Sequence, residues 1–147
     1  YDPESSDSNI LLNCDLVIIL GGNACYLFNS IKKTGTDILL KKIADRGTHI
    51  IGASAGAMLL SSGNKYTKYF GQILGIEENM SEMADTQGLK FTNDILFPHY
   101  DMFLTQVHNL DNKLTRIENE FNIKITRLKN MDFIYIDTKG DRIHVET

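Results

Sequence analysis

The first part of the chain alternates short apolar runs with stretches of helical periodicity. Residues 16–20 are continuously apolar and are followed at once by Gly21-Gly22-Asn23. A short apolar run that ends in a glycine turn is typical of a buried parallel strand. The next two stretches predict helices, because their apolar residues recur at helical spacing and each stretch ends at a glycine. The expected inner faces are Tyr26, Leu27, Phe28 and Ile31 in the first helix, and Ile38, Leu39, Leu40 and Ile43 in the second, which Thr36 would cap.

A second strand and helix meet at Ser54. Residues 48–53 are partly β-branched and predict a strand, and residues 55–60 predict the helix after it. Residues 61–88 are polar and weakly patterned, which predicts loop with short helix. The remaining expected elements are a brief strand over 95–97 that Pro98 stops, a helix striped by Leu114, Ile117 and Phe121, and a hairpin of strands near 133–137 and 142–146.

Strands that alternate with helices predict an α/β fold, with a mainly parallel sheet sandwiched by helices and a C-terminal β-hairpin. The 147 residues, 42% of them hydrophobic, are expected to form a single domain over 1–147 with one core. In such folds the functional site lies beyond the carboxyl ends of the strands. Gly22, Ser54 and His99 each follow a predicted strand, so we expect them to gather at one edge of the sheet.

Composition argues against several classes of function. The formal net charge is −4 and no cluster of Lys and Arg is interleaved with aromatic residues, so nucleic acid is not an expected partner. The longest apolar run, residues 16–20, is far shorter than the ~20 residues of a membrane helix, so no membrane is expected either. Cys14 and Cys25 lack the spacing of a metal site, which indicates reduced thiols in a cytoplasmic protein.

Residues 52–56, Gly-Ala-Ser-Ala-Gly, match the G-x-S-x-G nucleophile elbow, in which a serine occupies a sharp turn between strand and helix. The alternative is a turn of small residues that only lets the strand and the helix pack closely, but the predicted elements on both sides favour a nucleophile at Ser54. A helix N-terminus beside the serine offers backbone N–H groups to an oxyanion, so Ala55 is the first expected donor. Gly22 can approach closely enough to be the second, because it has no side chain.

Four histidines are candidates for the base that takes the serine proton: His49, His99, His108 and His144. His49 and His144 lie within predicted strands, where packing or exposure to solvent is the expected role, and His108 lies in a polar stretch before a helix. His99 directly follows the strand that Pro98 stops, so its ring would be presented at the same edge as the serine. His99 is therefore the expected base.

Three blocks of the sequence together resemble the signature of the peptidase E, or aspartyl dipeptidase, family of serine peptidases. They are residues 20–23 (Leu-Gly-Gly-Asn), 52–57 (Gly-Ala-Ser-Ala-Gly-Ala) and 97–101 (Phe-Pro-His-Tyr-Asp). The resemblance covers nearly the whole chain and implies a fold like that of the class I glutamine amidotransferases, which is broadly flavodoxin-like. It also implies a cytoplasmic enzyme without a cofactor that cleaves dipeptides with an N-terminal aspartate. The implied roles are Ser54 as nucleophile, His99 as base, and Gly22 and Ala55 as oxyanion donors.

The chain departs from the family pattern at its start and in its acidic residues. Family members have further strand and helix units before the Gly-Gly-Asn block, so an N-terminal segment or another chain, including a second copy in a homo-oligomer, would have to complete the sheet. They also carry an acid soon after the nucleophile helix, yet no Asp or Glu lies between Ser54 and Glu77. Another acid is expected just before the last hairpin, where this chain has Asn130. Asp132 has the same strand parity as Asn130 and is the expected acid that orients His99.

Several alternatives stay open at this point. Asp85, Asp94 and Asp101 are further candidates for the orienting acid. A family relative that has lost activity and acts as a binding or regulatory module is the main alternative function, whereas a glutamine amidotransferase would need cysteine at the position of Ser54. The expected partner is a small peptide. A preference for aspartate would require a cationic pocket, for which Arg46, Lys65 and Lys68 are available.

Overall fold

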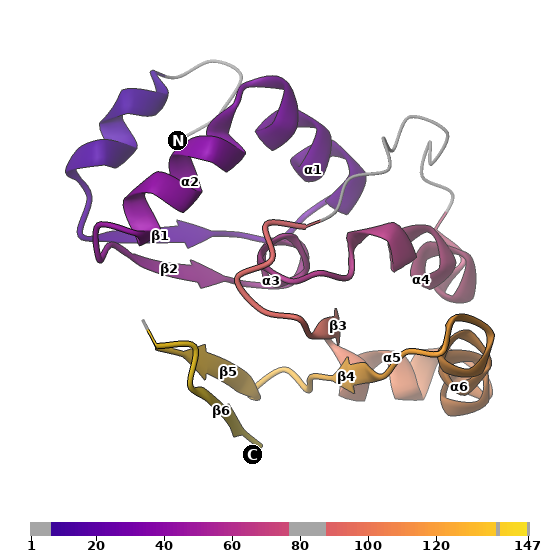
Figure 1. The fold of residues 1–147 in the computed structure, drawn as a ribbon. Helices are drawn as coiled ribbons and strands as arrows, with labels where there is room; N and C mark the ends of the chain where they lie inside the picture. Colours follow the sequence, from indigo (N-terminus) through magenta and orange to yellow (C-terminus); the bar gives the residue numbers. More distant parts are fainter. Residues whose placement is uncertain (1–6, 77–87, 138, 147) are drawn as a thin grey trace.

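The computed structural model describes residues 7–76, 88–137 and 139–146. The strands form three pairs, two parallel and one antiparallel, with helices around the parallel pairs (Figure 1). The pairs are β1 (Leu16–Ile19) with β2 (His49–Gly52), β3 (Ile95–Phe97) with β4 (Ile125–Arg127), and the antiparallel β5 (Phe133–Ile136) with β6 (Arg142–Val145). The α/β class, the parallel strands and the C-terminal hairpin are therefore as the sequence predicts.

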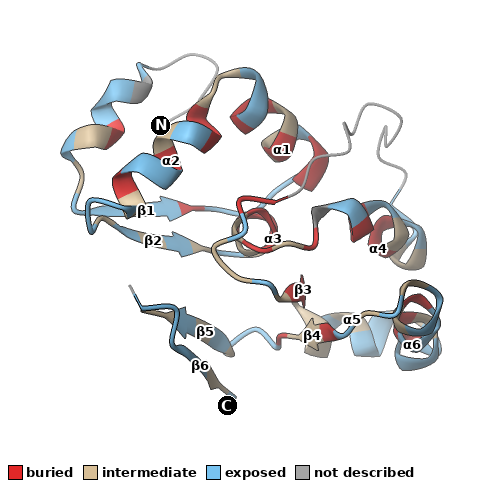
Figure 2. Cartoon of the chain, viewed as in Figure 1, coloured by how far each residue is buried: buried red, intermediate tan, exposed pale blue. Residues whose placement is uncertain are grey.

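Helices α1 (Ala24–Lys33) and α2 (Thr36–Ala44) lie on one side of the β1–β2 pair, close to the 3₁₀ helix η1 (Ser8–Asn13) (Figure 1). The two strands are largely exposed, as the pale blue arrows of Figure 2 show. Side chains alternate between the faces of a strand, so Val17 and Ile19 turn toward the helices while Leu16 and Ile18 remain 47% and 54% exposed.

The buried faces of α1 and α2 are narrower than the periodicity predicts. Phe28, Ile31, Leu40 and Ile43 are buried as expected, whereas Tyr26 and Ile38 are 58% and 71% exposed. The buried residues of α2 recur at positions 36, 37, 40 and 43, so Ile38 falls on the opposite face of the helix. The N-cap also differs from the expectation, because Gly35, in the left-handed conformation at φ 70°, precedes the first helical residue.

The short helix α3 (Ala55–Leu60) leads into η2 (Asn64–Tyr66) and α4 (Thr67–Leu74). Main-chain hydrogen bonds then join the end of α3 to the chain that enters β3. The Leu89 N–H donates to the Leu59 carbonyl at 2.8 Å, and the Phe91 N–H donates to the Leu60 carbonyl at 2.9 Å. Helix α4 agrees with the loop and short helix predicted over 61–88, of which residues 77–87 lie outside the described residues.

Two elements around the β3–β4 pair were not predicted from the sequence. They are α5 (Tyr100–Gln106) and β4 itself, while α6 (Leu110–Phe121) contains the predicted stripe. Leu114 and Ile125 are exposed by 1% or less and form part of the core between α6 and the sheet. Phe121 packs instead on two tyrosines, with ring centroids 5.4 Å from Tyr66 and 4.8 Å from Tyr69, and so connects α6 to α4.

Asp94 anchors the C-terminal hairpin to the residues before β3. Its carboxylate accepts hydrogen bonds from Arg142 Nε at 2.9 Å and Nη2 at 3.0 Å, and from the hydroxyls of Thr92 and Thr126. Burial alone would raise the pKa of Asp94, but these hydrogen bonds and the charge of Arg142 outweigh it and hold the pKa below its ordinary value. The ionised carboxylate is therefore the form that stabilises the hairpin.

We expect Asp94→Asn to lower the free energy of unfolding at neutral pH by about 1–2 kcal/mol, because a charge-assisted pair is lost from a partly exposed site. Since the folded-state pKa lies below the unfolded one, this stabilisation is present above the ordinary carboxyl pKa and disappears as the pH falls through the folded-state value. Urea unfolding at neutral and acidic pH measures the difference. The exposed Asp45, replaced by Asn, is the control, and an equal loss for Asp94→Asn at both pH values would contradict the assignment.

Candidate active site

Ser54 occupies a sharp turn between β2 and α3. Its backbone has φ 55° and ψ −119°, a conformation that residues with a side chain rarely adopt. A nucleophile elbow holds its serine in such a strained turn, so that the hydroxyl stands clear of the strand and the helix. The local geometry of Ser54 is thus the one that the motif predicts.

Three glycines allow the chain to pack tightly around this turn. A Cβ added to Gly56 would lie 2.1 Å from the carbonyl oxygen of Ile19, and a Cβ on Gly52 would lie 2.5 Å from the carbonyl oxygen of Gly56. A Cβ on Gly21 would lie 2.7 Å from the Cβ of Ser54. The motif therefore has both features: its small residues allow close packing, and its serine lies in a strained turn.

His99 is held at the carboxyl end of β3. It is the N-cap of α5 and has a left-handed backbone, at φ 58° and ψ 29°. The chain on both sides of it is hydrogen-bonded to Leu128, just beyond β4: the Leu128 N–H donates to the Phe97 carbonyl at 3.0 Å, and the Tyr100 N–H donates to the Leu128 carbonyl at 2.9 Å. Because β3 and β4 are parallel, residues that follow either strand lie at the same edge.

The His99 ring is hydrogen-bonded to Asn130, with 2.5 Å between Nδ1 and the Asn130 Oδ1. Asp101 holds Asn130 from the other side, accepting from its backbone N–H at 3.0 Å and from its Nδ2 at 3.2 Å. A carboxylate only accepts, so Asp101 fixes the amide with Nδ2 toward itself and Oδ1 toward the ring. The Asn130 oxygen also accepts, so the His99 Nδ1 carries the proton and Nε2 is the free acceptor.

The structure does not place Asp132 on the His99 ring. Its carboxylate accepts from the Lys129 N–H at 3.0 Å, within the turn that precedes β5. Of the other candidate acids, Asp94 is bound to Arg142, Asp101 reaches the ring only through Asn130, and Asp85 lies outside the described residues. The sequence does carry a pattern that points to Asn130. Residues 123–127 alternate between apolar and polar, which predicts a short strand just before it.

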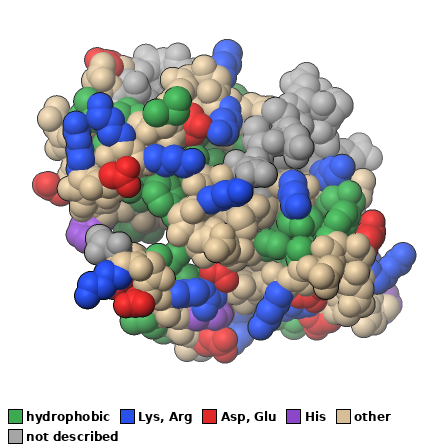
Figure 3. All heavy atoms as spheres, in the orientation of Figure 1, with side chains coloured by type: hydrophobic (Ala, Val, Ile, Leu, Met, Phe, Trp, Pro, Cys, Tyr) green, Lys and Arg blue, Asp and Glu red, His purple; other side chains and the backbone are tan. Residues whose placement is uncertain are grey.

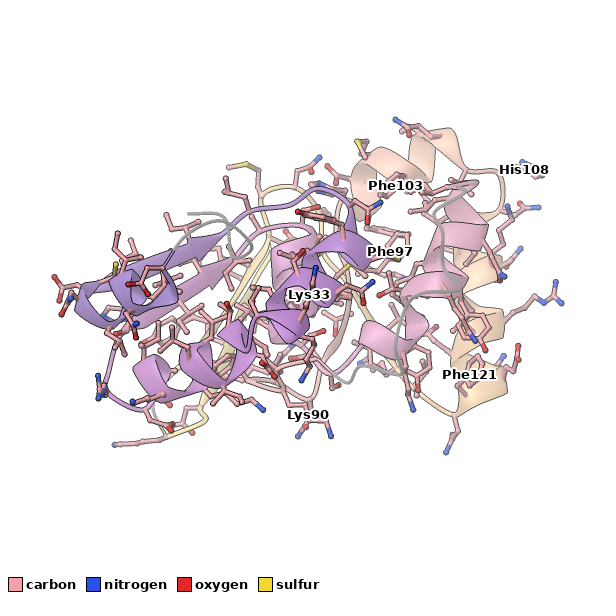
Figure 4. All side chains as sticks on the ribbon, turned by 90° about the horizontal axis from the view of Figure 1, so that it is seen from above. Lys33, Lys90, Phe97, Phe103, His108 and Phe121 are labelled. Carbon is pink, nitrogen blue, oxygen red and sulfur yellow. The ribbon has the colours of Figure 1, made fainter. Side chains whose placement is uncertain are left out.

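A cavity of about 160 Å³ opens beside the strained serine. Its lining includes all four residues expected at the edge of the sheet, namely Gly22, Ser54, Ala55 and His99. Phe97 and Phe103 complete the wall near the histidine and lie side by side in Figure 4, with ring centroids 5.9 Å apart. Within the described ranges Ser54 and His99 share no hydrogen bond, and in enzymes without substrate such contacts are commonly long.

The other histidines lie outside this cavity lining. His49 and His108 are exposed, and Figure 4 shows His108 pointing outward, away from Phe97 and Phe103. His144 is half-buried in β6, where its Nδ1 lies 3.6 Å from Glu146. Of the four histidines, His99 alone combines a cavity position with a partner that fixes its tautomer.

Cys14 and Cys25 are not joined in a disulfide, and Cys25 is buried. In the described part of the chain, no group of three or more His, Cys, Asp or Glu side chains is arranged to hold a metal ion. None of the helices in these ranges combines the length and the apolar character needed to cross a membrane. Basic and acidic side chains are interspersed on the face shown in Figure 3, and apolar side chains are visible there between α4 and α6.

Comparison with known proteins shows the family to which the chain belongs. Residues 2–144 match the sequence model of Peptidase family S51, so the chain belongs to this peptidase family. It is 28% identical over 89 residues to the uncharacterized peptidase PM1590 of Pasteurella multocida, and 28% identical over 87 residues to the uncharacterized peptidase Lin0382 of Listeria innocua. These matches cover 60% and 59% of this chain, and 41% and 40% of the two relatives. The chain therefore spans about two fifths of the length of the curated relatives it matches.

The fold is similar to a crystal structure from Listeria monocytogenes EGD-e that is described as a candidate peptidase E. The TM-score is 0.68 at 22% sequence identity, and the match covers 95% of this chain and 63% of the other. The family and the fold that the sequence blocks imply are thus confirmed.

The glycine contacts lead to a pair of matched substitutions. Gly56→Ala should destabilise the protein by about 1–3 kcal/mol, because the added methyl group meets the main chain of β1, which cannot move aside. Gly21→Ala should mainly slow the reaction of Ser54 with a serine-directed probe, because its methyl group meets the serine side chain itself. Thermal unfolding and the rate of labelling separate the two effects. A Gly56→Ala variant as stable as the wild type would contradict the close approach of α3 to β1.

Proposed function

We propose that the chain is a serine-type peptidase domain that hydrolyses small peptides through an acyl-enzyme on Ser54. The observation that carries the proposal is that the strained Ser54 and the tautomer-fixed His99 line the same cavity. Family membership supports peptidase chemistry, and the elbow geometry supports serine as the nucleophile.

In the proposed reaction the His99 Nε2 takes the proton of the Ser54 hydroxyl, and Ser54 Oγ forms a bond to the carbonyl carbon of the peptide. The backbone N–H groups of Gly22 and Ala55 donate to the oxyanion of the tetrahedral intermediate. The C–N bond then breaks, and His99 gives its proton to the leaving amine. Water, deprotonated by His99, cleaves the acyl ester, which releases the acid and restores the serine.

Asn130 takes the positioning role that the sequence suggested for Asp132. An orienting partner must keep the proton on Nδ1 and the lone pair on Nε2, and the Asn130 oxygen meets this requirement. An amide cannot offset the positive charge of a protonated imidazole, but the Asp101 carboxylate lies next in the same chain of hydrogen bonds. Asparagine occupies the third position in the papain-like cysteine proteases, so a neutral partner is compatible with this chemistry.

The resemblance to peptidase E implies an N-terminal aspartate in the substrate, and the serine chemistry proposed here does not include that preference. Binding an aspartate beside Ser54 requires a positive charge in the cavity. The matched relatives are themselves uncharacterized peptidases, so their names leave the preferred residue open. The chemistry proposed for Ser54 does not depend on which side chain the peptide carries.

We expect Ser54 to be labelled by a fluorophosphonate probe, because a serine with an adjacent base is nucleophilic whereas ordinary serines are not. Intact-mass analysis should show one adduct on the wild type and none on Ser54→Ala. Ser62→Ala is the control and should be labelled like the wild type, since Ser62 hydrogen-bonds to the carbonyls of Asn93 and Asp94. An unlabelled wild type that hydrolyses no peptide would instead favour a binding or regulatory module.

Asp101→Asn tests the chain of hydrogen bonds to the base. An asparagine at 101 no longer forces the Asn130 Nδ2 toward itself, so the Asn130 amide can turn and favour the tautomer with the proton on the His99 Nε2. We expect kcat to fall by about 10²- to 10⁴-fold, the upper value being that of a wrong tautomer in a protease triad, with KM and the melting temperature nearly unchanged. Asp132→Asn is the matched control. A large loss of kcat in Asp132→Asn, with Asp101→Asn active, would return the orienting role to Asp132.

A further inference from the structure

The cavity beside the serine has an apolar and uncharged lining. Apart from Ser54, His99 and Thr67, the described side chains that line it are alanine or larger apolar groups. The larger ones are Met58, Phe70, Leu74, Ile76, Phe97, Pro98 and Phe103. They come from α3, α4, β3 and α5, from the residue that follows β3 and from the residue that follows the α4 C-cap. Among the lining residues that the structure describes there is no Lys, Arg, Asp or Glu.

The basic residues that were candidates for binding an acidic substrate lie outside this cavity. Lys65 and Lys68 are exposed, and each ammonium group lies 4.9 Å from the ring centroid of the tyrosine that follows it. Arg46 is exposed beyond the C-terminal end of α2. Arg46 precedes β2 and Ser54 follows it, so the two residues lie at opposite edges of the β1–β2 pair. None of the three lines the cavity.

We propose that this cavity binds the substrate side chain next to the scissile carbonyl and selects a neutral, apolar side chain of about the size of leucine. The proposal rests on the proposed function, because it takes Ser54 as the nucleophile. A cavity of about 160 Å³ is close in size to an apolar cavity of ~150 Å³ that binds benzene, so it has room for one side chain. A carboxylate in this lining would lose its water without gaining a cation, so aspartate is disfavoured, whereas leucine gains by leaving water.

The test compares dipeptides with Leu, Asn or Asp at the N-terminus and alanine after it, since these three side chains are similar in shape and differ in polarity. For the wild-type protein we expect kcat/KM to be highest for Leu-Ala, intermediate for Asn-Ala and about 100-fold lower for Asp-Ala than for Leu-Ala. A kcat/KM for Asp-Ala equal to or above that for Leu-Ala would overturn the proposal.

A charge introduced into the lining provides a second arm of the test. Leu74 is partly buried at the end of α4, and Leu74→Arg should raise the ratio of Asp-Ala to Leu-Ala turnover by about 10-fold or more. Gln72→Arg adds the same charge to the exposed side of α4 and should leave the ratio unchanged. An equal change of the ratio in both variants would contradict binding of the side chain in this cavity.

Labelling by the fluorophosphonate distinguishes failure of this proposal from failure of the proposed function. If Ser54 is labelled and Asp-Ala is the better substrate, the serine mechanism stands and only the neutral selectivity is wrong. Without labelling or hydrolysis of any of the three dipeptides, both are wrong. The melting temperature of Leu74→Arg, compared with that of Gln72→Arg, shows whether the variant with the charge in the cavity is folded.

Discussion

The close approach of α3 to β1 is the constraint on which the site depends. The carbonyl oxygen of Ile19 accepts a hydrogen bond from the Ala53 N–H at 2.9 Å, and a Cβ on Gly56 would clash with the same oxygen. Strand and helix are therefore in main-chain contact, with no space for a side chain between them. The turn that contains Ser54 joins these two fixed backbones, and this packing overcomes the unfavourable backbone conformation of the serine.

Each half of the site lies at the carboxyl edge of a parallel strand pair. The β1–β2 pair presents Gly22 and Ser54 at its carboxyl edge, and the β3–β4 pair presents His99 and Asn130 at its own. The pairs are separate in their hydrogen bonding, so the distance between serine and histidine depends on the contacts that connect them. The hydrogen bonds from Leu89 and Phe91 to the end of α3 are such contacts, so they help to set how far apart the two halves of the site lie.

Sequence patterns located α1, α2, α3 and α6 and all the described strands except β4, because periodicity reports which side of an element is apolar, but they missed α5. They overestimated the width of the buried faces, since Tyr26 and Ile38 are exposed and Ile38 lies on the face of α2 opposite its buried residues. They also missed β4, because the alternating pattern of residues 123–127 is short and follows directly on the end of α6. The close contacts of Gly52 and Gly56 could not be derived from the sequence, because they depend on how closely α3 approaches the strands.

The sequence pointed to Asp132 as the partner of His99, whereas the structure has Asn130 there, and the cause is the backbone geometry. Side chains two residues apart point to the same side only where the backbone is extended. The chain instead turns between these positions, with the Asp132 N–H donating to the Lys129 carbonyl at 3.2 Å. Likewise, Asp101 is distant from Asn130 in sequence, and only the parallel pairing of β3 with β4 brings them together.

An amide beside the histidine has a consequence for how the site responds to acid. A carboxylate in that place would itself take up a proton in acidic solution and would then lose its charge and change its hydrogen-bonding pattern. The Asn130 amide keeps the same donors and acceptor over the whole range of pH in which the protein is folded. The orientation of the His99 ring therefore rests on a neutral partner, and the amide presents its oxygen to the ring because the Asp101 carboxylate holds its Nδ2.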